Sequence, residues 1–435
     1  MEDNNMTTQQ LRIVGGANTA DATARSVIDD EARKGRGLSS LLSIPGFQRL
    51  CASNAVTQSF GQRIQGIAVA WLVLEMTGSK FWLGVINGLP TVSIVLFSLI
   101  GGVLADSLNG RRILFLSRAA LALTSIIAAT LVSTGNVELS HLLLYVLVVV
   151  GIAAIDMPVS RTLVLKLVGS PRLLAASATQ SILTNVVNIL APVSVGLLIG
   201  IAGPGGAFWL LGGGYALAAA MIASGPVETE AVTPRQSSPL TDVIEGIRYI
   251  RRTPEVAALL GLGFLVPVAG VYFAMVPVFA REVLRVGPGA LGILVASFSA
   301  GSLLGSIYLA VNLSPRRRGL RLTQLGVLFG AGMMAFAMSQ SFLLSCAISF
   351  LLGATAGLWQ NMLSAMVQTV AVPEMRGRVV SVFTMAFQLL GIGWLAAGTL
   401  GTLAGNKSTL LAAGLVFALL SLAVFAWSRE TREID

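Results

Sequence analysis

The stretch 101–118, GGVLADSLNGRRILFLSR, lies between two apolar runs of the chain, 81–105 and 113–132. Each run is long enough to cross a bilayer as a helix, which takes about 20 predominantly apolar residues. The link between the runs is only seven residues long and carries one aspartate, Asp106, and a pair of arginines. Cations beside a membrane helix set its orientation, and a carboxylate accepts hydrogen bonds from a neighbouring helix N-terminus. The stretch therefore predicts a membrane hairpin with a short, charged loop.

The composition of the whole chain is that of a polytopic membrane protein. Of its 435 residues, 54% are hydrophobic and only 11% are charged, whereas a soluble globular chain carries about 25% charged residues. The net charge of +9 comes from basic residues in short loops beside apolar runs, without an aromatic-lined patch, so we expect no nucleic-acid partner. The two cysteines, Cys51 and Cys346, lie far apart in apolar runs, and we interpret them as small buried residues rather than a disulfide.

Twelve apolar runs are long enough to be transmembrane helices. They occupy 51–76, 81–105, 113–132, 139–165, 175–201, 207–224, 256–279, 289–312, 322–338, 342–370, 379–404 and 409–427. We therefore predict an all-α membrane protein with twelve transmembrane helices in two six-helix pseudo-repeats. Its predicted parts are a disordered cytoplasmic tail at 1–46, an N-terminal half at 47–224, a cytoplasmic inter-half loop at 225–255, a C-terminal half at 256–428 and a cytoplasmic tail at 429–435.

Basic residues are distributed unevenly between the predicted loops. Of the 29 Lys and Arg, four lie in the odd-numbered loops and one lies inside the first span, which leaves 24 in the tails, the even-numbered loops and the ends of the spans beside those loops. Cytoplasmic loops of membrane proteins carry the excess of positive charge. We therefore expect both termini in the cytoplasm.

The two predicted halves carry similar short patterns. Residues 82–84, WLG, open the second span, and residues 290–292, ALG, open the eighth. A Pro-Arg pair at 171–172 follows the fourth span, and PEMRGR at 373–378 follows the tenth. Internal six-span repeats are typical of secondary transporters, in which the substrate site lies between the repeats near the middle of the membrane.

The hairpin at 101–118 resembles the helix two–helix three signature of the major facilitator superfamily, through Gly102, Asp106, Arg111 and Arg112. Other stretches resemble one group of that superfamily, which includes enterobactin exporters and macrolide-efflux-type pumps. They are AWLVLEMTGS at 70–79, DMPVSR at 156–161, VFAREVL at 278–284 and RGRV at 376–379. The resemblance extends from about residue 47 to residue 430.

The resemblance implies a secondary transporter that exports a mid-sized organic molecule, such as a siderophore, drug or secondary metabolite, by proton antiport and alternating access. No GxxxxGK[ST] motif occurs, so we do not expect ATP to drive transport. We expect neither an enzyme nor a metal or cofactor. The expected partners are the small-molecule substrate, the lipid bilayer and the proton gradient, with the protein a monomer in a prokaryotic plasma or inner membrane. The alternatives are an importer or lipid transporter of the same fold, and a non-transporting sensor or scaffold.

An ionisable residue inside a membrane span is a functional candidate, because burying its charge costs at least about 2.5 kcal/mol. Arg63 is the clearest case, and Gln58 and Gln62 lie near its face of the first span. We expect Arg63 to line the cavity and meet an anionic or polar substrate group; alternatively it snorkels or bonds to a carbonyl of a neighbouring helix. Further substrate-site candidates are Asn185, Asn188, Tyr272, Met275, Gln360, Asn361 and Gln388. Helix–helix contact is the alternative for the polar members, and core packing is the alternative for the others.

The resemblance also implies a charge network at the cytoplasmic ends of the spans. Its predicted members are Gly102, Asp106, Arg111, Arg112, Asp156, Arg161, Arg376 and Gly377. The network would hold the inner gate shut in the outward-facing state, and the alternative is positive-inside topology with helix capping. The resembling group often has an aspartate at the position of Gln62, where glutamine cannot titrate. Asp156 is therefore the candidate for proton coupling, with an ion pair to Arg161 as the alternative.

Overall fold

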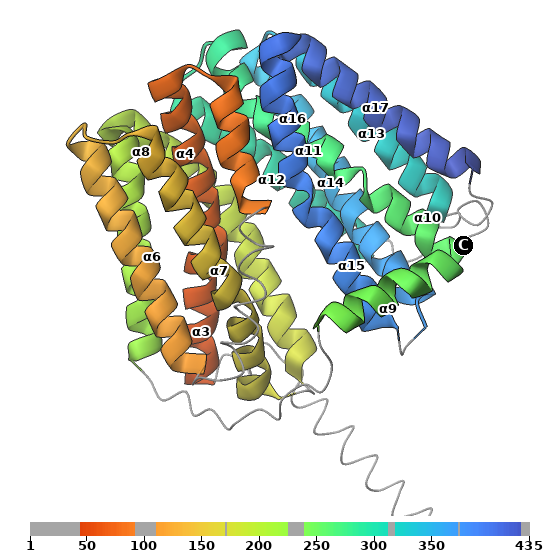
Figure 1. The fold of residues 1–435 in the computed structure, drawn as a ribbon, viewed down its shortest axis with the longest axis horizontal. Coiled ribbons are helices and arrows are strands. Elements are labelled where there is room, and N and C mark those ends of the chain that lie inside the picture. The colour runs from red at the N-terminus through yellow and green to blue at the C-terminus, as the bar shows by residue number, and fades with distance from the viewer. Residues whose placement is uncertain are drawn as a thin grey trace, which may run out of the picture.

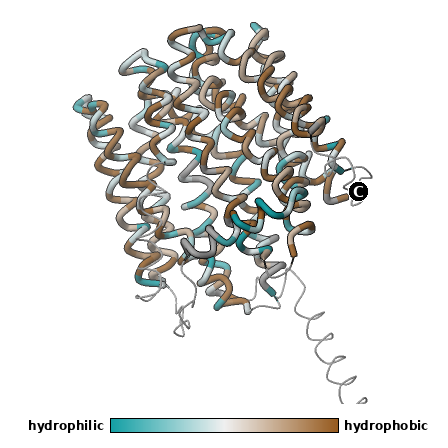
Figure 2. The backbone as a smooth tube through the Cα atoms, turned by 45° about the vertical axis from the view of Figure 1, so that its right-hand side comes forward, coloured by the Kyte–Doolittle hydropathy of each residue, from teal (hydrophilic) through white to brown (hydrophobic). Residues whose placement is uncertain are grey.

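The computed structural model describes residues 44–91, 110–169, 172–224, 239–311, 318–372 and 375–427, and the regular elements in these ranges are all helical. The signature residues Gly102 and Asp106 lie outside them. Nine of the described helices are long and apolar enough to cross a membrane. Figure 2 shows hydrophobic residues along most of the helical tubes. The predicted all-helical membrane fold is confirmed.

The first predicted span is a continuous helical segment with a π-helical centre. Helix α3 runs over Pro45–Asn54, the π-helix η1 over Ala55–Gly61, and α4 over Gln62–Thr77. Gly78, with a φ of 61°, ends α4 in the left-handed conformation that glycine adopts without strain. The next helix begins at residue 80 and is described to residue 91.

Three long helices complete the N-terminal half. They are α6 at Gly110–Ser133, α7 at Leu139–Val168 and α8 at Leu173–Ala223. Helix α8 contains both the fifth and the sixth predicted spans, which the sequence had suggested were separated by a short loop. The chain instead bends at Gly203, where φ is 70° and ψ is 178°, directly before Pro204. Glycine permits that conformation, and proline has no N–H to lose from the helix ladder.

The predicted inter-half loop at 225–255 contains helix α9, at Pro239–Arg252, which precedes the C-terminal half. The seventh span consists of α10 at Pro254–Gly263, α11 at Val266–Val278 and the π-helix η3 at Phe279–Val283. The next three spans are α12 at Pro288–Val311, α13 at Arg318–Met338 and α14 at Phe342–Val370. The last two are α15 and α16, at Arg376–Gln388 and Leu390–Leu403, and then α17 at Asn406–Trp427.

The two halves form two helical bundles side by side (Figure 1). They meet where helix 80–91 packs on α16 and where α8 packs on α12. A Cβ atom at Gly84 would lie 2.7 Å from the backbone oxygen of Trp394, and one at Gly196 would meet the backbone of Pro288. Small residues allow membrane helices to approach this closely. Glycine is therefore required where the halves touch.

Candidate functional site

Arg63 and Asn188, both predicted for the substrate site, lie together in the N-terminal half. The Arg63 Nε donates a hydrogen bond of 3.0 Å to Asn188 Oδ1, which joins α4 to α8. The Arg63 side chain is exposed, and Asn188 is half-buried. Asn185 is half-buried one helical turn earlier on α8, and Gln58 is half-buried in η1. Arginine carries five N–H groups, so the Arg63 guanidinium has four N–H groups that form no hydrogen bond with the described residues and that could donate to a ligand.

The predicted polar residues of the C-terminal half are on α14 and α15. Asn361 donates from Nδ2 to Ser306 Oγ and to the Gly357 carbonyl, both at 2.8 Å, so it links α14 to α12. Gln360 is exposed beside it. The Asn361 contacts agree with a helix–helix role, which was the alternative for these polar residues. Gln62 and Gln388 belong to α4 and α15, but their side chains lie outside the described part of the structure.

Tyr272 and Met275 are each only 1% exposed, inside the C-terminal bundle. The Tyr272 hydroxyl donates a 3.0 Å hydrogen bond to Ser349 Oγ. Its ring packs against aromatic neighbours on three sides, with centroid distances of 5.2 Å to Phe336, 5.8 Å to Phe298 and 5.4 Å to Phe273. This packing favours the core alternative over substrate contact, because the ring has no free face for a ligand in this conformation.

Asp156 is part of a buried polar network between α3, α6 and α7. Its Oδ2 accepts a 2.8 Å hydrogen bond from Ser117 and forms an ion pair of 3.3 Å with Arg118 Nε. Arg118 is 0% exposed. Its two remaining nitrogens donate to Ser53 Oγ and, at 2.6 Å, to Asn54 Oδ1. A buried charge is tolerated when it is paired and hydrogen-bonded in this way.

The predicted alternative partner of Asp156 is therefore wrong, since Arg118 takes the place expected for Arg161. Arg161 lies one and a half turns further along α7, and its side chain is exposed. Sequence reasoning missed Arg118, although it stands about one and a half turns inside the apolar part of the third span. The rule that singled out Arg63 as an ionisable group within a span would have found it.

Two buried atoms of this network have no hydrogen-bond partner among the described residues. They are Asp156 Oδ1 and Asn54 Nδ2. A buried polar atom without a partner costs free energy and calls for an explanation, such as a proton, a water molecule or a second conformation. The network also adjoins a π-helical segment, because Asn54 is the last residue of α3 before η1.

Four other predicted gate residues, Arg111, Arg112, Arg376 and Gly377, belong to the described part of the structure. Arg111 donates from Nε to the Ile222 carbonyl at 3.1 Å and from Nη2 to the Ala223 carbonyl at 2.7 Å. It therefore caps the C-terminus of α8, as the capping alternative predicted. Arg112, Arg376 and Gly377 are exposed.

A set of contacts that the sequence did not predict joins the two halves at the opposite end. Lys80 and Glu282 form an ion pair of 3.0 Å, and Asn406 Nδ2 donates to the same carboxylate oxygen at 2.7 Å. Arg281 donates to the carbonyl of Leu74. We call Lys80, Arg281, Glu282 and Asn406 the inter-half latch. Its sequence signal was weak, because Lys80, Arg281 and Glu282 were visible only as scattered charges in odd-numbered loops.

Comparisons with known proteins point to one family. The model of the Major Facilitator Superfamily matches residues 51–393. The multidrug efflux pump Tap of Mycolicibacterium fortuitum is 26% identical over 399 residues, which cover 88% of this chain and 95% of that one. The enterobactin exporter EntS of Escherichia coli O139:H28 is 24% identical over 409 residues, which cover 91% of this chain and 95% of that one.

Solved structures show the same fold. A bacterial homolog of the human lysosomal transporter Spinster, in an inward-facing and unoccupied conformation, superimposes with a TM-score of 0.73 at 15% identity, over 89% of this chain and 98% of that chain. The nucleoside transporter NupG gives a TM-score of 0.65 at 14% identity, over 91% and 99%. Since the family model spans most of the sequence, this chain belongs to the Major Facilitator Superfamily and is a multi-pass bacterial membrane transporter rather than an enzyme.

Proposed function

We propose that this protein exports a mid-sized organic molecule, such as a drug, a siderophore or a secondary metabolite, from the bacterial cytoplasm. The relatives that match it over nearly their whole length are named a multidrug efflux pump and an enterobactin exporter. The observation that supports a polar or anionic substrate group is the exposed Arg63, which is hydrogen-bonded to Asn188 and has further N–H groups without a partner among the described residues.

Export would proceed by alternating access. The latch ties Lys80 of the N-terminal half to Glu282 of the C-terminal half, and it lies in loops that the charge distribution assigns to the outer side. A transporter closed at its outer end is accessible from the cytoplasm, so we assign this conformation to the inward-facing state. Breaking the latch would accompany the change to the outward-facing state.

Proton antiport is the proposed source of energy, with Asp156 as the proton site. Its Oδ1 is buried without a partner among the described residues, while Oδ2 faces Arg118. A proton on Asp156 would remove the negative charge that compensates Arg118 and would weaken the ion pair. Because Arg118 also holds Ser53 and Asn54 of α3, protonation would release the segment that leads into η1.

The test is the accumulation of fluorescent drugs and one catechol siderophore in an efflux-deficient bacterium that expresses this chain. We expect lower accumulation than in cells without it, and a protonophore should abolish the difference. Asp156→Asn should transport poorly at every proton gradient. Glu75→Gln, which makes the same carboxylate-to-amide change at an exposed position of α4, is the matched control that leaves the buried pair intact. Higher accumulation would instead indicate an importer. If the accumulation of every compound stayed unchanged in cells with confirmed membrane expression of the protein, that result would contradict a broad exporter.

A further inference from the structure

We propose that the outer face of α9 is a binding surface for the headgroups of anionic phospholipids. This helix belongs to none of the predicted spans, and the transport cycle proposed above does not use it. It lies crosswise to the spanning helices at the end of the C-terminal half opposite the latch (Figure 1). A helix in this position runs along the membrane surface rather than through the membrane.

The inner face of α9 is fixed to the protein. Glu245 forms an ion pair of 3.0 Å with Arg378 at the start of α15. The hydroxyl oxygen of Tyr249 accepts a hydrogen bond of 3.4 Å from the Val372 backbone N–H. A Cβ atom at Gly246 would lie 3.1 Å from the Arg378 carbonyl, so the two backbones are closely packed there. The helix therefore has one defined face toward the bundle and one away from it.

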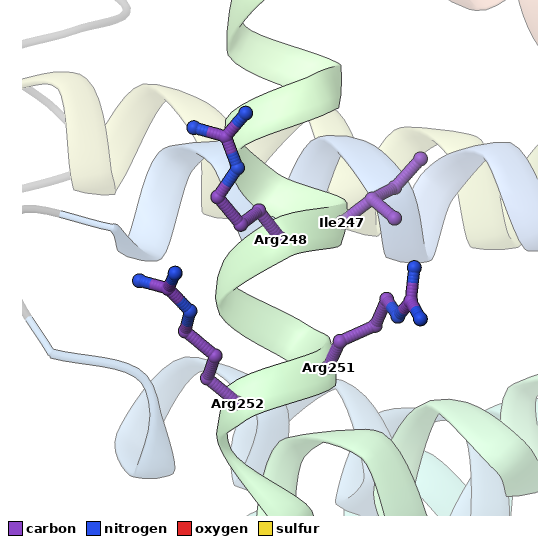
Figure 3. A pocket seen from close by; sticks show the side chains of 4 residues that line it. All are labelled: Ile247, Arg248, Arg251 and Arg252. Carbon is purple, nitrogen blue, oxygen red and sulfur yellow. The ribbon is translucent and has the colours of Figure 1, made fainter.

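The outer face carries three arginines and an isoleucine. Arg248, Arg251 and Arg252 are exposed, and Ile247 is 46% exposed among them. Figure 3 shows Arg248 and Arg252 leaving the helix on one side and Ile247 and Arg251 on the other. The four side chains line a hollow of about 450 Å³. No ion pair joins any of the three guanidinium groups to a side chain that the structure describes, and the Glu245 carboxylate pairs with Arg378 instead.

The chemistry of this face matches a membrane surface that contains phosphate. Guanidinium groups bind phosphate oxygens in a bidentate manner and are more weakly hydrated than lysine. The cluster ends at Arg252, two residues before the spanning segment Pro254–Val283 begins. Basic residues this close to a span attract anionic lipids, and an exposed apolar residue between them can enter the boundary between headgroups and acyl chains.

Binding at this face would also act on the transporter. Glu245 and Tyr249 contact the start of α15 and Val372, two residues after the end of α14, so a lipid that restrains α9 would restrain these two helices. The lipid composition of the inner leaflet would thereby bias the conformational change.

The test measures lipid selectivity directly and does not depend on transport. The purified full-length protein is placed in phosphatidylcholine bilayers with spin-labelled phosphatidylglycerol or spin-labelled phosphatidylcholine, and the motionally restricted fraction of each probe is measured. We expect a preference for phosphatidylglycerol that falls with added salt. In the triple variant Arg248→Gln/Arg251→Gln/Arg252→Gln the preference should fall at least about threefold.

Three comparisons make the result specific. The variant Arg285→Gln/Lys407→Gln, which removes exposed cations from the opposite end, should keep the preference of the wild type. Replacement of the three arginines by lysine should retain most of it, because the charge remains. An unchanged preference in the glutamine variant would overturn the proposal. Loss of the lipid preference in the lysine variant would also overturn the proposal. Competition by inorganic phosphate at constant ionic strength would overturn it too, because it would indicate a site for a soluble anion.

Discussion

Arg118 and Asp156 form a buried ion pair, and removal of one partner leaves the other charge uncompensated. We expect Arg118→Ala to lower the free energy of unfolding by about 3–5 kcal/mol. The double variant Arg118→Ala/Asp156→Ala should cost less than Arg118→Ala alone, because it buries no lone charge. Arg112→Ala removes an exposed arginine from the same helix and should change stability by no more than about 0.5 kcal/mol. Thermal unfolding in detergent measures all three, and equal losses in the single and double variants would contradict this account.

Arg63 is the residue on which the proposed substrate contact depends. We expect Arg63→Gln to reduce transport about 10-fold or more, since a hydrogen bond to a charged group contributes about 1.5–3 kcal/mol. Asn188→Ala should reduce transport less, because the guanidinium group remains and loses only the hydrogen bond that positions it. Arg63→Gln should keep the melting temperature of the wild type, because the Arg63 side chain is exposed. Transport into everted vesicles provides the measurement. Full activity of Arg63→Gln toward every substrate would exclude the cavity role.

At the scale of helices, the inter-half latch connects the beginning of helix 80–91 to η3 and α17. A partly exposed ion pair contributes about 0.2–1 kcal/mol, so Glu282→Gln should lower the population of this conformation by up to about fivefold. The charge swap Lys80→Glu/Glu282→Lys should restore much of the population of this conformation. Spin-label distances across the latch end of the molecule give the populations. No shift in Glu282→Gln would show that the ion pair does not hold the halves together.

Close packing between helix 80–91 and α16 leads to a second prediction at this scale. Gly84→Ala places a methyl group 2.7 Å from the Trp394 oxygen and 2.9 Å from the Gly398 Cα, which are backbone atoms that cannot easily move. The variant should therefore disfavour the closed latch end. Gly66→Ala is the matched control, since a Cβ atom there meets nothing within 4 Å. The same spin-label distances distinguish them, and identical behaviour of the two variants would contradict a steric requirement for glycine.

At the scale of the whole molecule, the charge distribution predicts which end faces the cytoplasm. After replacement of Cys51 and Cys346, a single cysteine at Lys407 should react with a membrane-impermeant thiol reagent in intact cells. A single cysteine at Arg252 should react only after the membrane is permeabilised. The reason is that 22 of the 29 basic residues lie in the tails and even-numbered loops, which include the loop that carries Arg252, and only four lie in the odd-numbered loops. The reverse labelling pattern would invert the topology and with it the assignment of the latch to the outer side.

Features that depend on a local run of residues were predictable from the sequence alone. A membrane helix requires about 20 apolar residues wherever they occur, so the helical membrane class followed from composition and run length. The nine described spanning helices cover ten of the twelve predicted spans, because α8 holds two. The first span is described as α3, η1 and α4, and the second only from residue 80 to 91. The family followed from short motifs, and the match over residues 51–393 confirmed it.

Contacts between distant segments were decided only by the tertiary structure. Asp156 pairs with Arg118, 38 residues away, rather than with Arg161 on its own helix, because helix packing places α6 beside the buried face of α7. In the same way, Lys80 and Glu282 meet only because the two halves close at one end. The sequence determined which residues enter the membrane, because that choice depends on the transfer of each segment from water to lipid. The choice of partners depends on how the helices pack, and packing brings together residues that no local pattern relates.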